Sequence, residues 1–472
     1  WNGSVNSLWE EPLNWNCGIV PTSSTAVTIP LDAAIYPVIN DGVTGFSNNL
    51  NVEAGASLSV LGNLNISGTI SGTINAEEGT ITFSGSLPQS IPLNAFSGDL
   101  VDDITVDNPS QVTLEGPVQV SGILKIIQGN LVSNGFLTLI SDKDRTALIS
   151  GSGSGNVLGS IKLQRFLEPA YGYKYFSSPL KGTTVADFQP YIDLQDPSTG
   201  FPHFYRYVEN REDENGNDLT GWEAYSVSSM PLNPLEGYAV NFGEAGGTKI
   251  VTISGEVNNG PQSRNLTHNN GAYTKGFNLV GNPYPSPIDW NKTTGWTKTN
   301  IDDAIYFFSS SSSDPYTGTY SSYIENGISS DGNTSSIIPS MQGFFVHVTD
   351  GSTQGVLGVT NEARVDEQTQ AFHKTANEKI PLLRITAGFE KEALSDPTVI
   401  YFAPKAEVSF DKELDALKLM NTNPEVPSIY SLTSDKKELS INALPIALQK
   451  DQVRIPMGYN ALKAGKLQIE LQ

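Results

Sequence analysis

The chain has 472 residues, of which 38% are hydrophobic and 17% charged, and its 50 acidic residues outnumber 28 lysines and arginines to give a net charge of −22. This excess of negative charge repels a phosphate backbone and an anionic membrane surface, so composition argues against nucleic acid and acidic lipid as partners. Because the sequence contains no run of 18 apolar residues, we expect no membrane span.

Composition also predicts the fold class. The polar residues are mostly Gly, Ser, Thr and Asn, which favour short strands joined by turns, and 472 residues exceed what one core usually supports. We therefore expect an all-β chain of several domains. Cys17 is the single cysteine, and the histidines (His203, His268, His347, His373) are scattered, so neither disulfides nor a zinc motif are predicted. The first residues lack a signal-peptide pattern, so we interpret the sequence as a piece of a longer, processed chain.

Short alternating strands recur through residues 1–150. The stretch LNVEAGASLSVLGNLNISGTISGTINAEEGTITF at residues 50–83 has glycines between its strands, and a similar run follows at residues 104–140. Strands this short bury no face alone, whereas stacked coils share one apolar interior. The pattern predicts a parallel β-helix, or β-solenoid. A sandwich of short hairpins is the alternative, which the scarcity of Asn-Gly and Asp-Gly turns disfavours.

Three tryptophans, Trp1, Trp9 and Trp15, fall within the first fifteen residues. Clustered aromatic side chains can stack on sugar rings. The open end of a solenoid, however, exposes apolar surface and backbone groups that need a cover. We therefore expect a Trp-rich cap at the N-terminal end of the β-helix, with sugar binding as the alternative.

Composition changes after GSGSGN, residues 151–156, which is typical of a flexible spacer. Aromatic residues then become frequent in strand-like segments such as YGYKYF, HFYRYVEN and EGYAVNF. The spacing predicts an aromatic-rich β-sandwich module over residues 151–360 and a second one over residues 361–472, of jelly-roll or immunoglobulin-like type. The last residues, KLQIELQ, resemble a strand. We expect that the second module is truncated and that this edge pairs with a neighbouring chain by strand addition.

Several phrases resemble the large secreted and cell-surface proteins of Bacteroidota that leave the cell by type IX secretion. The central module carries QRFLEPAYGYKYFSSPL, GWEAYSV, EGYAVNF, GFNLVGNPYPSPIDW and IIPSMQGFFVHV in that family's order. DNPSQVTLEGPVQVSGILKIIQGNLVSNG is similar to its β-helical part, and the final segment is similar to the module before its C-terminal sorting domain. The resemblance implies export, an extracellular or cell-surface location, and a role in adhesion or the cell envelope. It implies no catalytic site.

The most distinctive phrase is GFNLVGNPYPSPIDW, residues 276–290. Three prolines in five residues fix φ and extend the residues before them, which is typical of a rigid corner. A catalytic role for Asp289 needs a second carboxylate at roughly 5 Å, for which Asp302 and Asp303 are the candidates. The other alternative is a ligand site for a sugar, built from Trp222, Tyr284, Asp289 and Trp290.

The acidic stretch DENGNDLTGWEA, residues 213–224, is a candidate calcium site. Asp213, Asn215 and Asn217 stand where a calcium loop places its first three ligands, and Asp218, a further candidate oxygen donor, stands at the sixth position. The glycine of the sixth position and the glutamate of the twelfth are missing, and no flanking helices are predicted. A hairpin turn at Asn215-Gly216 is the simpler interpretation. Calcium is the one cofactor that the sequence suggests.

Other catalytic patterns are missing from the sequence, which contains no GxSxG elbow, P-loop or dinucleotide fingerprint. We therefore expect a non-catalytic, exported structural or adhesive protein, such as an adhesin stalk or a component of an extracellular filament. Its expected partners are the type IX secretion machinery, other copies of itself, cell-surface proteins and glycans. The alternative is a carbohydrate-binding accessory region of a secreted polysaccharide-degrading enzyme.

Overall fold

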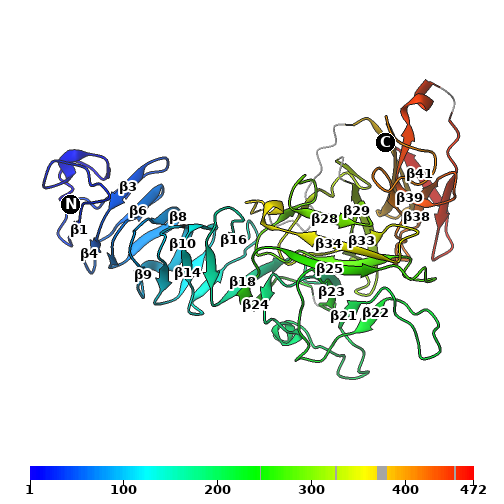
Figure 1. Ribbon diagram of the computed structural model, residues 1–472, viewed down its shortest axis with the longest axis horizontal. Coiled ribbons are helices and arrows are strands. Elements are labelled where there is room, and N and C mark those ends of the chain that lie inside the picture. Colours follow the sequence, from blue (N-terminus) through cyan, green and yellow to red (C-terminus); the bar gives the residue numbers. More distant parts are fainter. Residues whose placement is uncertain (245, 325–326, 369–379, 451–452) are drawn as a thin grey trace.

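The computed structural model describes residues 1–244, 246–324, 327–368, 380–450 and 453–472, so His373 lies outside the described residues. It is all-β, with 45% of residues in strands and 3% in helix, which confirms the predicted class. Figure 1 shows an elongated molecule in which a narrow stalk carries a broad body, with the N-terminus at the free end of the stalk. Within these described ranges, no helix is long and apolar enough to cross a membrane.

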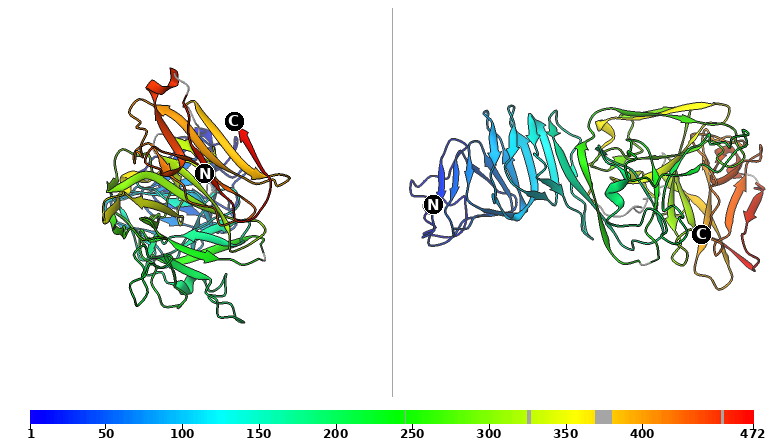
Figure 2. Two further views of the ribbon diagram at one scale, coloured as in Figure 1. Left: turned by 90° about the vertical axis from the view of Figure 1, so that its right-hand side faces the viewer. Right: turned by 90° about the horizontal axis from the view of Figure 1, so that it is seen from below.

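The stalk is a β-solenoid of about six turns, as predicted. Its strands pair in parallel from coil to coil, for example with Leu50 beside Ile70 and Val118 beside Leu137, and these side chains point into one buried core. Parallel pairing excludes the hairpin alternative, because hairpins are antiparallel. Figure 2 shows the coils stacked along the long axis. The strands are β1 (Val27–Ile29), β2 (Val38–Ile39), β3 (Thr44–Ser47), β4 (Leu50–Val52), β5 (Ser59–Val60), β6 (Asn63–Ile66), β7 (Ile70–Ser71), β8 (Ile74–Phe83), β9 (Gln89–Ile91), β10 (Phe96–Asp107), β11 (Val112–Leu114), β12 (Val118–Val120), β13 (Ile123–Gln128), β14 (Asn130–Val132), β15 (Leu137–Leu139), β16 (Leu148–Ile149) and β17 (Asn156–Leu158).

The three N-terminal tryptophans lie buried at the free end of the stalk. Trp15 makes edge-to-face contacts with Trp1 and Trp9, with ring centroids 4.9 and 4.8 Å apart. The Trp1 indole donates a hydrogen bond to the Ile35 carbonyl, and all three rings belong to the solenoid core. This packing buries the three rings and leaves their faces little access to a sugar. The Trp-rich cap stays a prediction.

One strand carries the solenoid into the body. β18 (Ser160–Leu167) pairs in parallel with β15 on one edge and antiparallel with β24 (Lys249–Val257) on the other. A single 13-stranded sheet therefore runs from the stalk into the body. The domain boundaries after residues 150 and 360 stay predictions.

The GSGSGN segment does not form the free spacer that its composition suggests. Ser154 donates its backbone N–H to the Ile127 carbonyl of the preceding coil, so the segment belongs to the solenoid. Glycine is needed here for close packing. A Cβ on Gly153, whose φ is +98°, would lie 2.1 Å from the Ile126 carbonyl oxygen.

A buried arginine also crosses the junction between stalk and body. Arg364 donates from Nε to Ser286 Oγ at 2.7 Å, and its terminal nitrogen donates to the Ile149 carbonyl at the end of the solenoid. Beside it, Ile149 donates its own N–H to the Pro285 carbonyl. The guanidinium lies 5.1 Å from the centre of the Tyr284 ring. These contacts pin the last coil to the proline-rich loop of the body.

A five-stranded antiparallel sheet, β26-β33-β29-β30-β31, forms the centre of the body. One of its faces packs on the three-stranded sheet β25-β34-β28, and its other face packs on the C-terminal sheet through a core that includes Tyr306 and Tyr401. The body strands are β19 (Tyr173–Phe176), β20 (Leu180–Lys181), β21 (Phe204–Tyr207), β22 (Trp222–Ala224), β23 (Tyr238–Asn241), β25 (Gln262–Thr267), β26 (Phe277–Gly281), β27 (Ile288–Asp289), β28 (Trp296–Thr299), β29 (Ile301–Ser310), β30 (Gly318–Ile324), β31 (Ile328–Ser329), β32 (Ile337–Ile338), β33 (Gly343–Val348) and β34 (Gln354–Val359).

The C-terminal sheet has seven strands, in the order β40-β38-β39-β36-β35-β41 with β37 beside β39. The strand expected in KLQIELQ is present as β41, which pairs with β35 of the same chain. The strands are β35 (Leu382–Phe389), β36 (Ser395–Ala403), β37 (Ala416–Leu417), β38 (Ser428–Leu432), β39 (Glu438–Pro445), β40 (Met457–Asn460) and β41 (Leu467–Leu471).

Short 3-10 helices interrupt the strands in several parts of the described chain. They are η1 (Pro12–Asn14), η2 (Val185–Phe188), η3 (Asn361–Ala363) and η4 (Ile446–Lys450).

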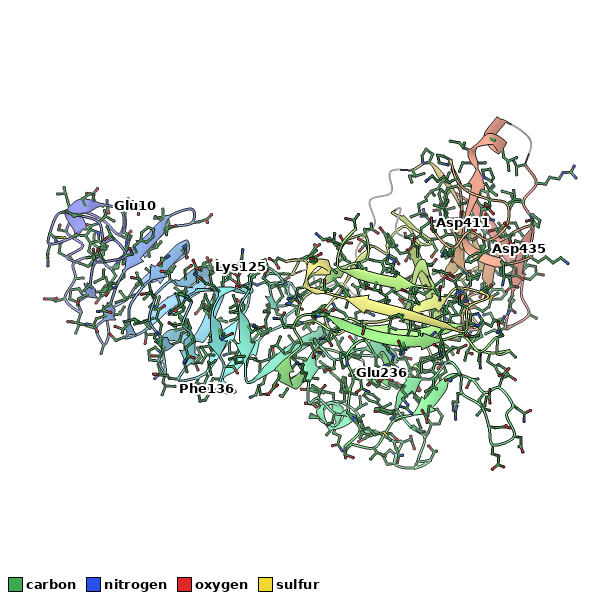
Figure 3. The ribbon with its side chains drawn as sticks, viewed as in Figure 1. Glu10, Lys125, Phe136, Glu236, Asp411 and Asp435 are labelled. Atoms are coloured by element: carbon green, nitrogen blue, oxygen red, sulfur yellow. The ribbon has the colours of Figure 1, made fainter. Side chains whose placement is uncertain are left out.

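A buried carboxylate lies beside this sheet. Asp415 is 1% exposed, and its two oxygens accept hydrogen bonds from the Ala443 and Asp411 N–H groups at 2.7 and 2.8 Å. Burial raises the pKa of Asp415 to about 7, the two hydrogen bonds lower it by less, and the carboxylates of Asp411 and Asp435 add to the rise. Figure 3 labels both of these neighbours beside the C-terminal strands.

We predict that Asp415 makes the C-terminal sheet less stable as pH rises. Its folded pKa lies above the unfolded value of about 3.9, so the folded state binds the proton more tightly, and the free energy of unfolding falls between about pH 4 and pH 7. The Asp415→Asn side chain does not titrate, so the variant lacks this loss. The free energy of unfolding of the variant minus that of the wild type should therefore increase as pH rises across this window. Hydrogen exchange of the β39 amides at about pH 5 and about pH 8 measures the difference. A stability difference that is the same at both pH values contradicts the assignment.

Candidate functional site

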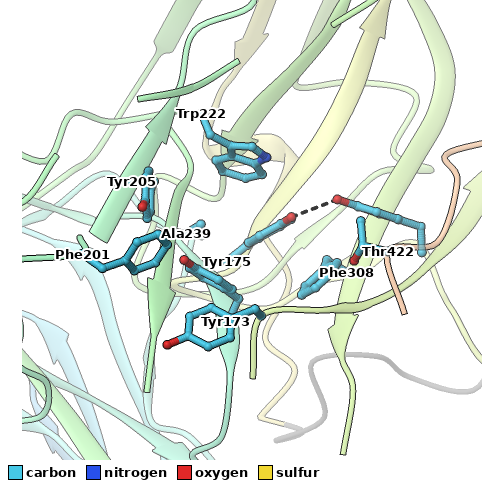
Figure 4. A pocket seen from close by; sticks show the side chains of 10 residues that line it. Tyr173, Tyr175, Phe201, Tyr205, Trp222, Ala239, Phe308 and Thr422 are labelled. Carbon is cyan, nitrogen blue, oxygen red and sulfur yellow. Dashed lines mark hydrogen bonds between the residues drawn. The ribbon is translucent and has the colours of Figure 1, made fainter. Parts of the chain in front are cut away.

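An aromatic pocket opens on the body, with a cavity volume of about 260 Å³ (Figure 4). Eight of its ten lining residues are aromatic, and one, Thr422, comes from the C-terminal part of the chain. The pocket therefore lies where the C-terminal part meets the body. Its lining consists of Tyr173, Tyr175, Phe201, Tyr205, Trp222, Ala239, Phe308, Tyr316, Tyr320 and Thr422.

The four-stranded sheet β19-β23-β21-β22 supplies the floor of the pocket. Side chains alternate along a strand, so Tyr173 and Tyr175 of β19 project from the same face. The antiparallel register sets Ala239 of β23 directly between Tyr175 and Tyr205. A single methyl group between two tyrosines leaves a hollow, and this is why the aromatic face is concave at that point.

The opposite wall comes from the β29–β30 hairpin. Phe308 on β29 stacks on Tyr175, with ring centroids 4.9 Å apart. The hydroxyl groups of Tyr320 on β30 and Tyr175 are 3.1 Å apart and form a hydrogen bond, drawn as a dashed line in Figure 4. The turn between the two strands carries Tyr316, which is 50% exposed. The hairpin thus adds both a buried wall and an accessible rim.

The walls of the pocket are uncharged. None of the ten lining residues is an acid, a lysine, an arginine or a histidine. Burial raises the pKa of Tyr320 to about 12 and that of Tyr175 well above its ordinary value, so their hydroxyls stay protonated near neutral pH. The site offers aromatic faces and a few hydroxyl groups, which suits binding better than acid–base chemistry.

The four residues predicted to bind a sugar do not lie together in one surface. Trp222 is half-buried on β22 and lines the pocket, where its ring lies 5.6 Å from that of Tyr175. Trp290 is 0% exposed and donates from Nε1 to the Asp303 carbonyl at 2.7 Å. Tyr284 is also 0% exposed, and its hydroxyl donates to backbone carbonyls of the body. Their role in ligand binding stays a prediction.

The phrase GNPYPSPIDW forms a buried corner. Residues 281–288 are all buried. The Asn282 side-chain amide donates to the carbonyls of Ser286, Ile338 and Pro339, at 2.9, 3.0 and 3.1 Å. Gly281 is required because a Cβ there would lie 2.1 Å from the Cβ of Ser177. These contacts agree with the rigid-corner interpretation of the three prolines.

The acids considered as catalytic partners are engaged in separate contacts. Asp289 accepts a hydrogen bond from the Asn291 N–H at 3.0 Å. Asp302 is 1% exposed and accepts from His347, whereas Asp303 lies 3.5 Å from the Lys298 ammonium group. The arrangement gives no reason to pair Asp289 with either of them.

The candidate calcium loop folds as an exposed hairpin turn. Asp213 accepts hydrogen bonds from the backbone N–H groups of Asn215 and Asn217, at 2.9 and 2.8 Å, and Gly216 has a φ of +77°. The Asp218 carboxylate accepts instead from the Ala272 N–H at 2.9 Å. The calcium site stays a prediction.

Sequence spacing gave no sign of a histidine cluster that the fold brings together. Nitrogen atoms of His268 and His347 and an oxygen of Asp350 all lie within 4.8 Å of one another, which is a possible grouping for metal ligands. The ring nitrogens, however, already take part in hydrogen bonds within the protein. His268 accepts the Asn270 N–H at Nδ1, and both nitrogens of His347 face acceptors, namely Asp302 and the Lys275 carbonyl. We interpret the cluster as a hydrogen-bonded support.

We predict different outcomes for the two tryptophans proposed as ligand residues. Trp290→Ala removes a fully buried ring from the body core and should lower the free energy of unfolding by about 3–5 kcal/mol. Trp222→Ala truncates a half-buried ring at a pocket wall, so the protein should stay folded with a smaller loss. Thermal unfolding of both variants tests this. Equal losses, or a larger loss for Trp222→Ala, would contradict the assignment of Trp290 to the core.

A family model described as a domain of unknown function (DUF8693) matches residues 1–94 and 94–472, which together span the whole chain. Searches of curated proteins and of solved structures found no match.

Proposed function

The chain belongs to the DUF8693 family, and because that family's description assigns no activity, we propose a function from the residues themselves. The protein is an exported, non-catalytic adhesive or structural protein of the cell surface, delivered by type IX secretion. The stalk is a rigid spacer, and the body is the part that contacts a partner. The resemblance of its phrases to type IX substrates supports the export and the location.

The observation that carries this proposal is the continuous sheet between stalk and body. β18 pairs with β15 of the solenoid and with β24 of the body, so the two parts are joined by backbone hydrogen bonds as well as by Arg364. A stiff rod that holds a body at a fixed distance from its base suits adhesion or assembly. The uncharged pocket and the separation of the candidate acids support a non-catalytic role.

We also propose that the packed sheets of the body and of the C-terminal part are two β-sandwich modules. The partners are the secretion machinery, cell-surface proteins and other copies of the chain. Self-assembly is supported by β41, which is the outermost strand in the described order of its sheet and pairs through one edge with β35. Among the described residues no strand pairs with its other edge, which makes that edge a candidate for strand addition.

The first test is labelling of intact cells of the native source with an antibody against the body. We expect surface labelling that protease treatment removes and that a strain without type IX secretion lacks. Labelling only after the cells are permeabilised contradicts export. A matched comparison of the 472-residue chain with the same chain lacking residues 466–472 then separates assembly from export. The shortened chain should still be exported but should no longer self-assemble, because only assembly depends on β41.

A carbohydrate-binding accessory region of a secreted polysaccharide-degrading enzyme is the second candidate. The pocket favours it, because Trp222 and the tyrosines present ring faces on which sugars stack. Glycan-array binding by the wild type, lost in folded Trp222→Ala and kept in Tyr273→Leu, is the expected result. Tyr273 is 64% exposed and is not among the pocket's lining residues, so it is a matched control. Binding that persists in Trp222→Ala contradicts a role for the pocket.

A further inference from the structure

Four rings at the mouth of the pocket form a closed box. Tyr173, Tyr205, Phe201 and Tyr316 contact one another in a cycle, with neighbouring centroids 6.3, 6.3, 5.8 and 6.4 Å apart. Their planes are inclined to one another by 62°, 56°, 87° and 65°, so no two neighbouring rings stack in parallel, and all four rings line the same cavity. Phe201 and Tyr316 are 44% and 50% exposed, which places the opening of the box at the surface. Figure 4 shows Tyr173, Phe201 and Tyr205 around the same cavity.

We propose that this box binds a quaternary ammonium group, as found in choline and betaines. The inference rests on the proposed binding role of the body and names the chemistry of its ligand. The faces of aromatic rings are negative and attract a cation within about 6 Å of the ring centroid. Four centroids at the corners of a square of side about 6 Å would place its centre about 4 Å from each, within that reach.

The surroundings of the box favour a cation. The chain carries a net charge of −22. The carboxylate of Asp314 accepts the Tyr316 N–H at 2.9 Å, so a negative charge lies beside the exposed rim. The nearest lysine along β19, Lys174, lies within hydrogen-bonding reach of Ser310 Oγ and does not line the pocket. An ammonium group therefore meets attraction at the rim and no cationic side chain on the walls.

The four-ring box, unlike the Trp222 wall of the same pocket, is poorly suited to a neutral sugar. A sugar packs the C–H face of its ring on one exposed aromatic face, whereas these four rings are steeply inclined to one another and suit a compact group. Sugar hydroxyls also need several polar partners, because unpaired polar groups are costly to bury. The four residues of the box supply three tyrosine hydroxyl groups and no carboxylate, amide or guanidinium group.

Isothermal titration of the full chain with three probes tests the proposal. Choline chloride is the cation, 3,3-dimethylbutan-1-ol is its neutral isostere with carbon in place of nitrogen, and cellobiose represents a neutral sugar. We expect choline to bind about tenfold or more tightly than the isostere, because only the cation gains from the ring quadrupoles. Equal binding of choline and its isostere overturns the proposal, as does binding of cellobiose alone or of no probe.

Variants at the exposed rim locate the site without endangering the fold. Tyr316→Leu and Phe201→Leu keep apolar side chains but remove one wall of the box each, so choline should bind about tenfold more weakly. Tyr273→Leu removes an exposed ring outside the pocket and should bind choline like the wild type. Equal affinity in all three variants means that choline binds elsewhere and overturns the assignment.

A further arm distinguishes the source of the ammonium group. Sedimentation with phosphatidylcholine vesicles, lost in Tyr316→Leu, assigns the box to a lipid headgroup, whereas choline binding without sedimentation assigns it to a small soluble ligand. The proposed function is tested separately by labelling of intact cells. Surface labelling without choline binding overturns the box alone, and choline binding by a protein that stays inside the cell overturns export alone.

Discussion

A buried guanidinium holds the two parts of this molecule together. Arg364 is 7% exposed, and burial lowers its pKa only to about 10, so it stays charged near neutral pH. A buried charge is tolerable only when hydrogen bonds compensate it. Ser286 of the proline-rich loop and the Ile149 carbonyl of the last coil supply that compensation. The hydrogen bonds of the Arg364 guanidinium therefore require both the end of the stalk and the corner of the body. If either part moved away, the buried guanidinium would lose one of its hydrogen-bond acceptors.

This constraint explains why the proline-rich phrase is rigid and buried. Its backbone carbonyls accept hydrogen bonds from both parts of the molecule, with Ile149 donating to Pro285 and Val365 to Pro287. Prolines fix the path of the loop before these contacts form, which lowers the entropy cost of ordering it. The loop thus forms a fixed connection between stalk and body. The continuous sheet through β18 is a second connection between them. The aromatic pocket, on the body side, is held at a constant position relative to the stalk.

The sequence predicted regular features well and junctions poorly. Period-two alternation with glycines between strands predicted the solenoid, because each coil repeats the same local rule. GSGSGN was mistaken for a spacer, since composition cannot show that Gly153 packs against Ile126 of the preceding coil. The sequence predicted only one residue of the pocket lining as a ligand residue. Trp222 was named among the ligand residues, but the box joins Tyr173 to Phe201 and Tyr316, which are distant in sequence and meet only through sheet pairing and the β29–β30 turn.

The clustered histidines were missed for the same reason. His268 and His347 are 79 positions apart and have no motif spacing, yet the β25–β34 and β26–β33 pairings bring them side by side with Asp350. Trp290 was proposed as a ligand residue for its position in a distinctive phrase, and the structure places its ring in the core of the body. That burial depends on contacts between distant segments, which a sequence pattern does not show. Its role in ligand binding stays a prediction.

Electron microscopy of single particles of the full chain tests the central claim that stalk and body form one stiff unit. We predict elongated particles with a single angle between stalk and body. Arg364→Ala should broaden that distribution of angles, because it leaves the Ile149 carbonyl and Ser286 without their donor, and the exposed control Arg454→Ala should match the wild type. A wild-type distribution as broad as that of Arg364→Ala would contradict the account.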